Sequence, residues 1–215
     1  MIPAKESAAF VYRMEQVLDV YERGYDPLHP VVCLDESPRQ LTECRSFTAA
    51  DGQQRHDSEY IRHGVRDLYM CYEPLAGKRY VSVEENHNRF TWVKVISGLL
   101  DDQYKDCKMM TLVQDNLSAH KPAAFYEVFA PEIAKAYLDR LEFIFTPAHG
   151  SWLNMAEIEL SVLNRKTDGY IHCPAKLKEL VEKWQKERNK INLSTNWQFT
   201  NKDARVKLKK LYPSI

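Results

Sequence analysis

The amino-acid sequence predicts a single domain of the mixed α/β class. Three short apolar runs, at residues 31–34, 109–113 and 141–145, have the length and the β-branched or aromatic content of buried strands. Segments with apolar side chains at helical spacing lie between and after these runs. A chain of 215 residues is long enough to bury a sizeable core. Together these features are typical of a sheet covered by helices.

The N-terminal third predicts one helix followed by paired strands. Residues 7–23 carry apolar side chains at helical spacing. A buried strand is expected at residues 31–35, and residues 40–47 are expected to form its hairpin partner. The polar residues 48–58 predict a surface loop.

The middle of the chain predicts a second hairpin and then alternates between helix and strand. Residues 66–85 read as the hairpin, with its turn at residues 74–77. Residues 88–100 return to helical spacing, and the strand at residues 109–115 follows. Pro122 suits the first position of another helix, because its missing N–H group is not needed there.

The C-terminal third predicts helices after one more strand. The strand at residues 141–145 leads through a Pro/Gly loop into a helix that carries Glu157. Pro174 again suits a first helical position. Thr200 with Asp203 predicts a capping box for a last helix.

Composition argues against a membrane protein and against a disulfide-rich secreted one. No apolar run approaches the length of a membrane span, and the N-terminus lacks the pattern of a signal peptide. The five cysteines are odd in number and form no CxxC pair. We therefore expect reduced thiols in a cytoplasmic protein and no structural zinc site.

The net charge of zero conceals an asymmetry along the chain. Residues 164–215 contain 13 basic and 5 acidic side chains, a balance of +8, whereas residues 1–163 have a balance of −8. A basic tail on an acidic body favours a polyanionic partner that is approached through the tail. The alternative is that these lysines only solvate the surfaces of two helices.

Three carboxylates follow predicted strands in a way that suggests a metal site. Asp35 and Asp115 each come directly after a buried strand, and Glu157 lies on the helix after the strand at residues 141–145. Strands that deliver carboxylates at their carboxyl ends can build a site for Mg²⁺ at the edge of a sheet. Each acid alone has a structural alternative, in a turn or a helix cap. Their joint placement favours the metal site.

The predicted helix also separates Glu157 from its neighbour Glu159. At 100° per residue, Glu157 shares a polar stripe with Asn154, Ser161 and Asn164. Glu159 lies among apolar side chains, so we expect it to pair with a cation at the edge of the core. The polar stripe is the better place for a wet site that faces phosphate.

Four stretches that together span nearly the whole chain resemble a known family. They are VVCLDE, TLVQDNLSAHK, FTPAHGSWLNMAEIELSVLNRK and WQFTNKDARVKLKKLYPS. They resemble the catalytic domain of a bacterial insertion-sequence transposase from the mariner-related DDE superfamily of endonucleases. The resemblance implies a ribonuclease H-like fold, in which helices cover both faces of a mixed sheet. Relatives commonly have LNPIE where this chain has LNMAE, so Met155 and Ala156 depart from the family pattern.

The resemblance also implies a reaction and the residues that perform it. Asp35, Asp115 and Glu157 match the catalytic triad, which binds Mg²⁺, with Mn²⁺ as a substitute, as two ions. The expected activity is cleavage of DNA phosphodiesters at the ends of an element and strand transfer to target DNA. Asn116 and His120 are expected to support the metal site or to contact phosphate. A loop hydrogen bond is the structural alternative for His120.

The expected partners follow from the basic tail and from what full-length relatives contain. The three lysines expected to contact DNA phosphates are Lys207, Lys209 and Lys210. Relatives carry helix-turn-helix modules ahead of the catalytic domain, and we expect residues 1–215 to contain none. We expect these residues to form one catalytic domain with a basic helical C-terminal part. It would act as a homodimer on DNA, together with an upstream helix-turn-helix polypeptide or with a missing N-terminal half that carries such modules. The alternatives are a non-catalytic DNA-binding or assembly remnant and a structure-selective nuclease on the same fold.

Overall fold

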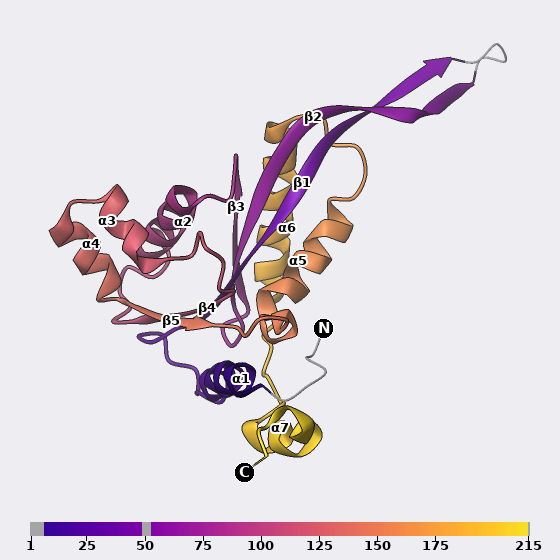
Figure 1. Cartoon of the computed structure of the whole chain (residues 1–215). Coiled ribbons are helices and arrows are strands. Elements are labelled where there is room, and N and C mark those ends of the chain that lie inside the picture. The colour runs from indigo at the N-terminus through magenta and orange to yellow at the C-terminus, as the bar shows by residue number, and fades with distance from the viewer. Residues whose placement is uncertain (1–6, 49–52, 215) are drawn as a thin grey trace.

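The computed structural model describes residues 7–48 and 53–214 and contains a five-stranded sheet in the order β3-β2-β1-β4-β5 (Figure 1). The strands β1, β2 and β3 pair antiparallel, whereas β1, β4 and β5 pair parallel. The sheet is therefore mixed, as the sequence predicts. The strands are β1 (Val31–Thr48), β2 (Gln54–Glu73), β3 (Lys78–Glu84), β4 (Met110–Gln114) and β5 (Leu141–Phe145).

Helices cover both faces of this sheet (Figure 1). Those of one layer are α2 (Arg89–Asp102), α3 (Phe125–Val128) and α4 (Pro131–Leu138). Those of the other are α1 (Ala8–Tyr21), α5 (Met155–Lys166), α6 (Pro174–Ile191) and α7 (Asn201–Lys207). The predicted capping box is present, because Thr200 and Asp203 bond each other's main-chain N–H groups at the start of α7. Among the described residues, no helix combines the length and apolar character that crossing a bilayer requires.

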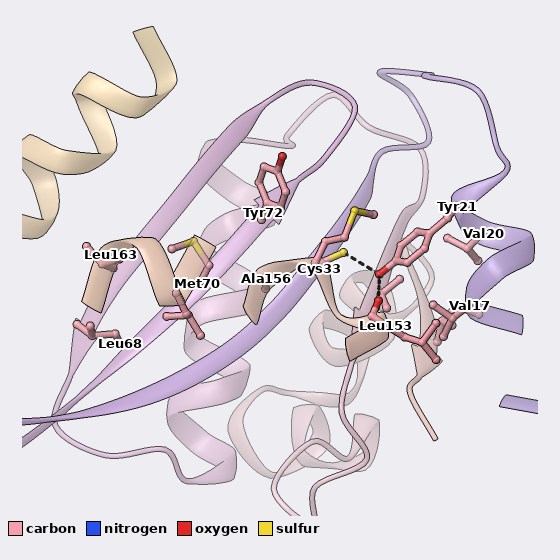
Figure 2. Close-up of a cluster of buried hydrophobic side chains, with 14 of the residues drawn as sticks. Val17, Val20, Tyr21, Cys33, Leu68, Met70, Tyr72, Leu153, Ala156 and Leu163 are labelled. Carbon is pink, nitrogen blue, oxygen red and sulfur yellow. Dashed lines mark hydrogen bonds between the residues drawn. The ribbon is translucent and has the colours of Figure 1, made fainter. Parts of the chain in front are cut away.

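The period-two alternation of β1 builds a separate core on each face. Val32 and Leu34 point into the cluster under α2, and Cys33 points into the cluster under α1 and α5. Figure 2 shows the second cluster, where the Tyr21 hydroxyl donates to the Leu153 carbonyl oxygen at 2.6 Å and lies 3.3 Å from the Cys33 sulfur. The chain just before α5 is thereby tied to both α1 and β1.

The strands β1 and β2 continue past the sheet as a two-stranded arm, which consists of residues 40–48 of β1 and residues 54–65 of β2 (Figure 1). Cys44 lies opposite Tyr60 near the middle of the arm. Residues 40–47 therefore extend β1 instead of forming its hairpin partner, and residues 54–58 of the expected loop belong to β2. The rest of that loop, residues 49–52, falls outside the described residues. Polarity misled the prediction because a two-stranded ribbon that extends beyond the sheet can be as polar as a loop.

The outer edge of β3 is covered by α6. The side-chain amide of Asn189 bonds both the N–H and the carbonyl oxygen of Arg79 at 2.8 Å, and the N–H of Val81 donates to Gln185 Oε1 at 2.7 Å. These amides occupy main-chain groups through which another strand would pair. The predicted hairpin turn closes with the Gly77 N–H donating to the Pro74 carbonyl oxygen.

Candidate metal centre

The parallel pairing of β1 and β4 brings two of the predicted acids to one level of the sheet. Cys33 pairs with Val113. Continuing this register by two residues places Asp35 level with Asp115. Both acids lie two residues beyond side chains of the core under α5, so the period of two directs them toward that layer.

The helix α5 is fixed along β1 by two asparagine side chains. Asn154 caps the helix and donates from Nδ2 to the Leu34 carbonyl oxygen at 2.8 Å. Asn164, near the other end, donates to the Ser37 hydroxyl at 3.0 Å. Leu34 and Ser37 lie on either side of Asp35 in β1. Glu157, in the first turn of α5, is thus held over the end of the parallel strands.

Asp35 has acidic neighbours, and two of them are the other predicted acids. Burial raises the pKa of the Asp35 carboxyl, and the charges of Glu36, Glu157 and Asp115 raise it further, to about 7. An acid near neutral pKa with carboxylate neighbours is a site where a cation would relieve repulsion. The structure therefore places Asp115 and Glu157 near enough to Asp35 for their charges to act on it, whereas the group of described residues whose ligand atoms lie within 4.8 Å of one another is Glu36, Asp115 and His120.

A second set of contacts joins Glu36 to Asp115 through a buried histidine. His120 is 2% exposed, and its Nε2 lies 2.8 Å from Glu36 Oε1. Its Nδ1 lies 2.8 Å from Asp115 Oδ1 and 3.2 Å from the Asp115 carbonyl oxygen. The ring N–H is aligned with the carbonyl oxygen, so the contact with Oδ1 is an ion pair without an aligned hydrogen bond. The ligand atoms of these three residues all lie within 4.8 Å of one another.

The charge of His120 follows from this placement. Burial alone would lower its pKa, but the close contacts with the carboxylates of Asp115 and Glu36 outweigh burial and raise the pKa to about 10. The ring is therefore an imidazolium at neutral pH, with a proton on each nitrogen. The ring of Trp92 stacks on it with centroids 5.7 Å apart.

Glu36 lies on the face of β1 opposite Asp35, because it pairs with Tyr69 of β2, whose side chain belongs to the core under α2. The contact with His120 was missed because it depends on the path of the loop after β4. Asn116, in that loop, is exposed. The three lysines of the tail are also exposed: Lys207, Lys209 and Lys210.

The two glutamates of α5 have different surroundings, as their helical positions predict. Glu159 is 3% exposed and accepts from the guanidinium groups of Arg79 at 2.8 Å and Arg188 at 3.1 Å. Burial opposes its ionisation, but these two bonds keep its pKa below the ordinary value. The prediction that Glu159 pairs with a cation is confirmed. Glu157 is half-buried, on the side of α5 that carries Asn164.

The donor set of this centre fits a hard divalent cation. Asp35, Asp115 and Glu157 offer carboxylate oxygens, which are the ligands that Mg²⁺ and Mn²⁺ prefer. Asp115 Oδ1 has no aligned hydrogen-bond donor, so a lone pair remains for a metal. The Asp115 side chain is 39% exposed, which leaves the centre open to a large substrate.

A mixed sheet with acids at the ends of adjacent parallel strands, and a third acid on the following helix, defines the ribonuclease H-like class of metal-dependent nucleases. The family described as DDE superfamily endonuclease matches residues 30–178. This match covers more than half of the chain, which therefore belongs to that family. Comparison with curated proteins gives no match.

Solved structures of the Mos1 mariner transposase share the fold. The paired-end complex with Mn matches 90% of this chain and 60% of its own, with a TM-score of 0.57 and 14% identity. The strand transfer complex matches 100% of this chain and 65% of its own, with a TM-score of 0.59 and 12% identity. A paired-end complex with Mg has a TM-score of 0.53 and 13% identity. The present chain thus spans about 60% of the first of these relatives.

Proposed function

We propose that this chain is the catalytic domain of a DNA transposase that uses Mg²⁺, or Mn²⁺ in its place. Its activity would be cleavage of DNA phosphodiesters at the ends of an element and strand transfer to target DNA. The observation that supports this proposal best is the placement of Asp35 level with Asp115 at the ends of β1 and β4, where the charges of Asp115 and Glu157 both raise the Asp35 pKa. The solved complexes of the similar Mos1 chain with Mn and with Mg agree with it.

The proposed chemistry is two successive in-line displacements at phosphorus. Water attacks first, so a P–O bond forms while the ester bond to the 3′ oxygen breaks and that oxygen leaves as a hydroxyl. The freed 3′ hydroxyl then attacks a target phosphodiester, and the target's own 3′ oxygen leaves. Asp35, Asp115 and Glu157 would hold two ions, which when bound stabilise the charge on the attacking and leaving oxygens.

A nicking assay on supercoiled DNA tests this function. The wild-type chain, supplied with its upstream DNA-binding polypeptide, should nick DNA with Mg²⁺ or Mn²⁺ and not with EDTA. Asp35→Asn, Asp115→Asn and Glu157→Gln should each abolish nicking and retain the fold by thermal unfolding. Nicking that survives in all three variants would contradict the assignment of the centre.

Two alternatives make different predictions in the same assay. A non-catalytic DNA-binding or assembly remnant would bind DNA but nick nothing with any metal. A structure-selective nuclease on the same fold would cleave branched DNA in preference to the element's ends. The three acids favour catalysis, since a remnant has no need to keep a repulsive cluster.

We also propose a homodimer on DNA, assembled with an upstream helix-turn-helix polypeptide. The exposed apolar side chains of the arm, Tyr60, Ile61 and Val65, offer a surface for the second copy. Light scattering with and without element-end DNA tests this state. A monomer at all concentrations on DNA would contradict it.

A further inference from the structure

Glu36 and His120 form a pair that the proposed chemistry does not itself require. We propose that both are positioning residues for the metal centre: Glu36 holds the His120 ring, and the ring fixes the carboxylate of Asp115. This inference rests on the proposed function, because it assigns Asp115 to the metal. Neither residue needs to touch the ion.

The geometry separates Glu36 from the triad while linking it to Asp115. Glu36 follows Asp35 in β1, so their side chains leave opposite faces of the sheet. The Glu36 side chain is only 8% exposed, and its Oε1 lies 2.8 Å from His120 Nε2. A carboxylate buried to this degree requires a partner, and His120 provides one. Glu36 therefore contacts Asp115 through the ring, although its charge also acts on Asp35 across the strand.

The ring is restrained on three sides, as a positioning device requires. Its flat face stacks on Trp92, whose Nε1–H donates to Gln114 Oε1 at 2.9 Å. Its two nitrogens meet Glu36 and Asp115 at 2.8 Å each. Gln114 immediately precedes Asp115, so the indole and the imidazole both hold the end of β4 from one side.

Asp115 is the acid of the centre that most needs such support. It follows the last residue of β4, and its side chain is 39% exposed. A metal ligand has to be held to within about 0.5 Å of its working geometry by neighbouring groups. Removing partners of this kind lowers metal affinity by about 10–100-fold in other proteins. We expect a loss of that size when the Glu36–His120 pair is broken.

The experiment measures Mn²⁺ affinity by electron paramagnetic resonance on the full chain, with thermal unfolding as a check of the fold. Glu36→Ala and His120→Ala should each weaken Mn²⁺ binding about 10–100-fold. The double variant should be no worse than either single variant, because both act through one ring. Glu36→Gln keeps an acceptor oxygen for Nε2 and should retain most of the affinity.

A matched pair elsewhere in the chain controls for loss of any glutamate–histidine contact. Glu43 Oε2 lies 2.8 Å from His63 Nε2 on the arm, where both side chains are exposed. Glu43→Ala should leave Mn²⁺ affinity unchanged.

Two results would contradict the proposal. If Glu36→Gln and Glu36→Ala lose the same amount of Mn²⁺ affinity, the charge of Glu36 would be what matters, and Glu36 would be a metal ligand. Unchanged affinity in Glu36→Ala, with a lower melting temperature, would make the pair structural only. Retention of Mn²⁺ binding in Asp35→Asn and Asp115→Asn would instead overturn the proposed function, because the metal would then bind elsewhere.

Discussion

Asp35 couples the charge of the centre to pH. Its folded-state pKa of about 7 lies above the ordinary value of 3.8 because of burial and three acidic neighbours. An acid with a raised folded-state pKa favours folding only in its protonated form. Its contribution to stability is complete below pH 3.8 and is lost as pH rises to about 7. In the metal-free protein, the ionised form of the Asp35 carboxylate therefore opposes folding as pH rises to about 7 and above.

The first prediction concerns metal affinity as a function of pH. Because a proton on Asp35 competes with the ion, the apparent Mn²⁺ affinity should fall about tenfold per pH unit below pH 7 and level off above it. Titrations between pH 5.5 and 8.5 would measure this slope. Asp35→Asn should weaken binding throughout and melt higher than wild type without metal at pH 8. An equally steep slope in that variant would assign the proton to another group.

The second prediction separates the two glutamates of α5. Glu159→Gln removes the partner of the buried Arg79 and should lower the free energy of unfolding by about 3–5 kcal/mol, while some metal-dependent nicking remains. Glu157→Gln should change the unfolding free energy by no more than about 0.5 kcal/mol and eliminate nicking. Urea unfolding and the nicking assay check both. The reverse pattern would show that the other glutamate belongs to the centre.

At this scale the sequence predicts what local pattern determines. Asp35 and Asp115 are found because each follows an apolar strand run, and Glu159 because of its helical face. The bond between Glu36 and His120 joins residues 84 apart in the chain. It depends on where the loop after β4 returns to β1, and no local pattern specifies that path.

Among the elements, the helices are predicted better than the long strands. Helix starts carry their own signals, such as the Thr200 side chain at α7, and these depend on the neighbouring sequence alone. The arm has no such signal, since its sequence is as polar as that of a loop. Its base is held instead by a distant contact, in which the Thr42 N–H donates to the Ile171 carbonyl oxygen at 2.9 Å.

The third prediction tests whether the arm belongs to the folding unit. Cys44 and Tyr60 are opposed in the ladder, so replacing residues 45–59 by Asn-Gly gives a hairpin with a two-residue turn. The melting temperature should change by only a few degrees, because the core side chains that the structure describes all lie outside residues 45–59. Dimer formation on DNA should persist, because the replacement keeps Tyr60, Ile61 and Val65. Loss of the fold would show that the distal arm stabilises the domain.

In the whole molecule, basic and acidic side chains are concentrated in different regions of the chain. Residues 164–215 have a charge balance of +8, and residues 1–163 have a balance of −8. Part of the positive charge is neutralised internally, since Arg205 bonds Glu15 and Lys207 lies 3.3 Å from Asp203. Lys209 and Lys210 are exposed in the short 3-10 turn after α7. They are the better candidates for phosphate contacts.

The last prediction concerns how the isolated chain binds duplex DNA. Positive side chains that neutralise phosphates give binding that is steep in salt and nearly indifferent to sequence. Replacing Lys207, Lys209 and Lys210 with Gln should weaken binding to all sequences alike. It should flatten the slope of log affinity against log salt by about 2–3 units, with the smaller value if Lys207 stays with Asp203.

Competition binding across a salt series, with random duplex against the element's own ends, measures both effects. The matched control replaces three exposed lysines of the opposite layer, which are Lys105, Lys108 and Lys135. This control removes the same number of positive charges as the tail variant. It should therefore flatten the salt slope only if affinity depends on net charge and not on where the lysines lie. Selectivity for the ends should appear when the upstream helix-turn-helix polypeptide is added, because base edges in the major groove are read by such modules. Strong preference for the ends by the isolated chain would contradict this division, and the reading of base sequence would then belong to the residues of this domain.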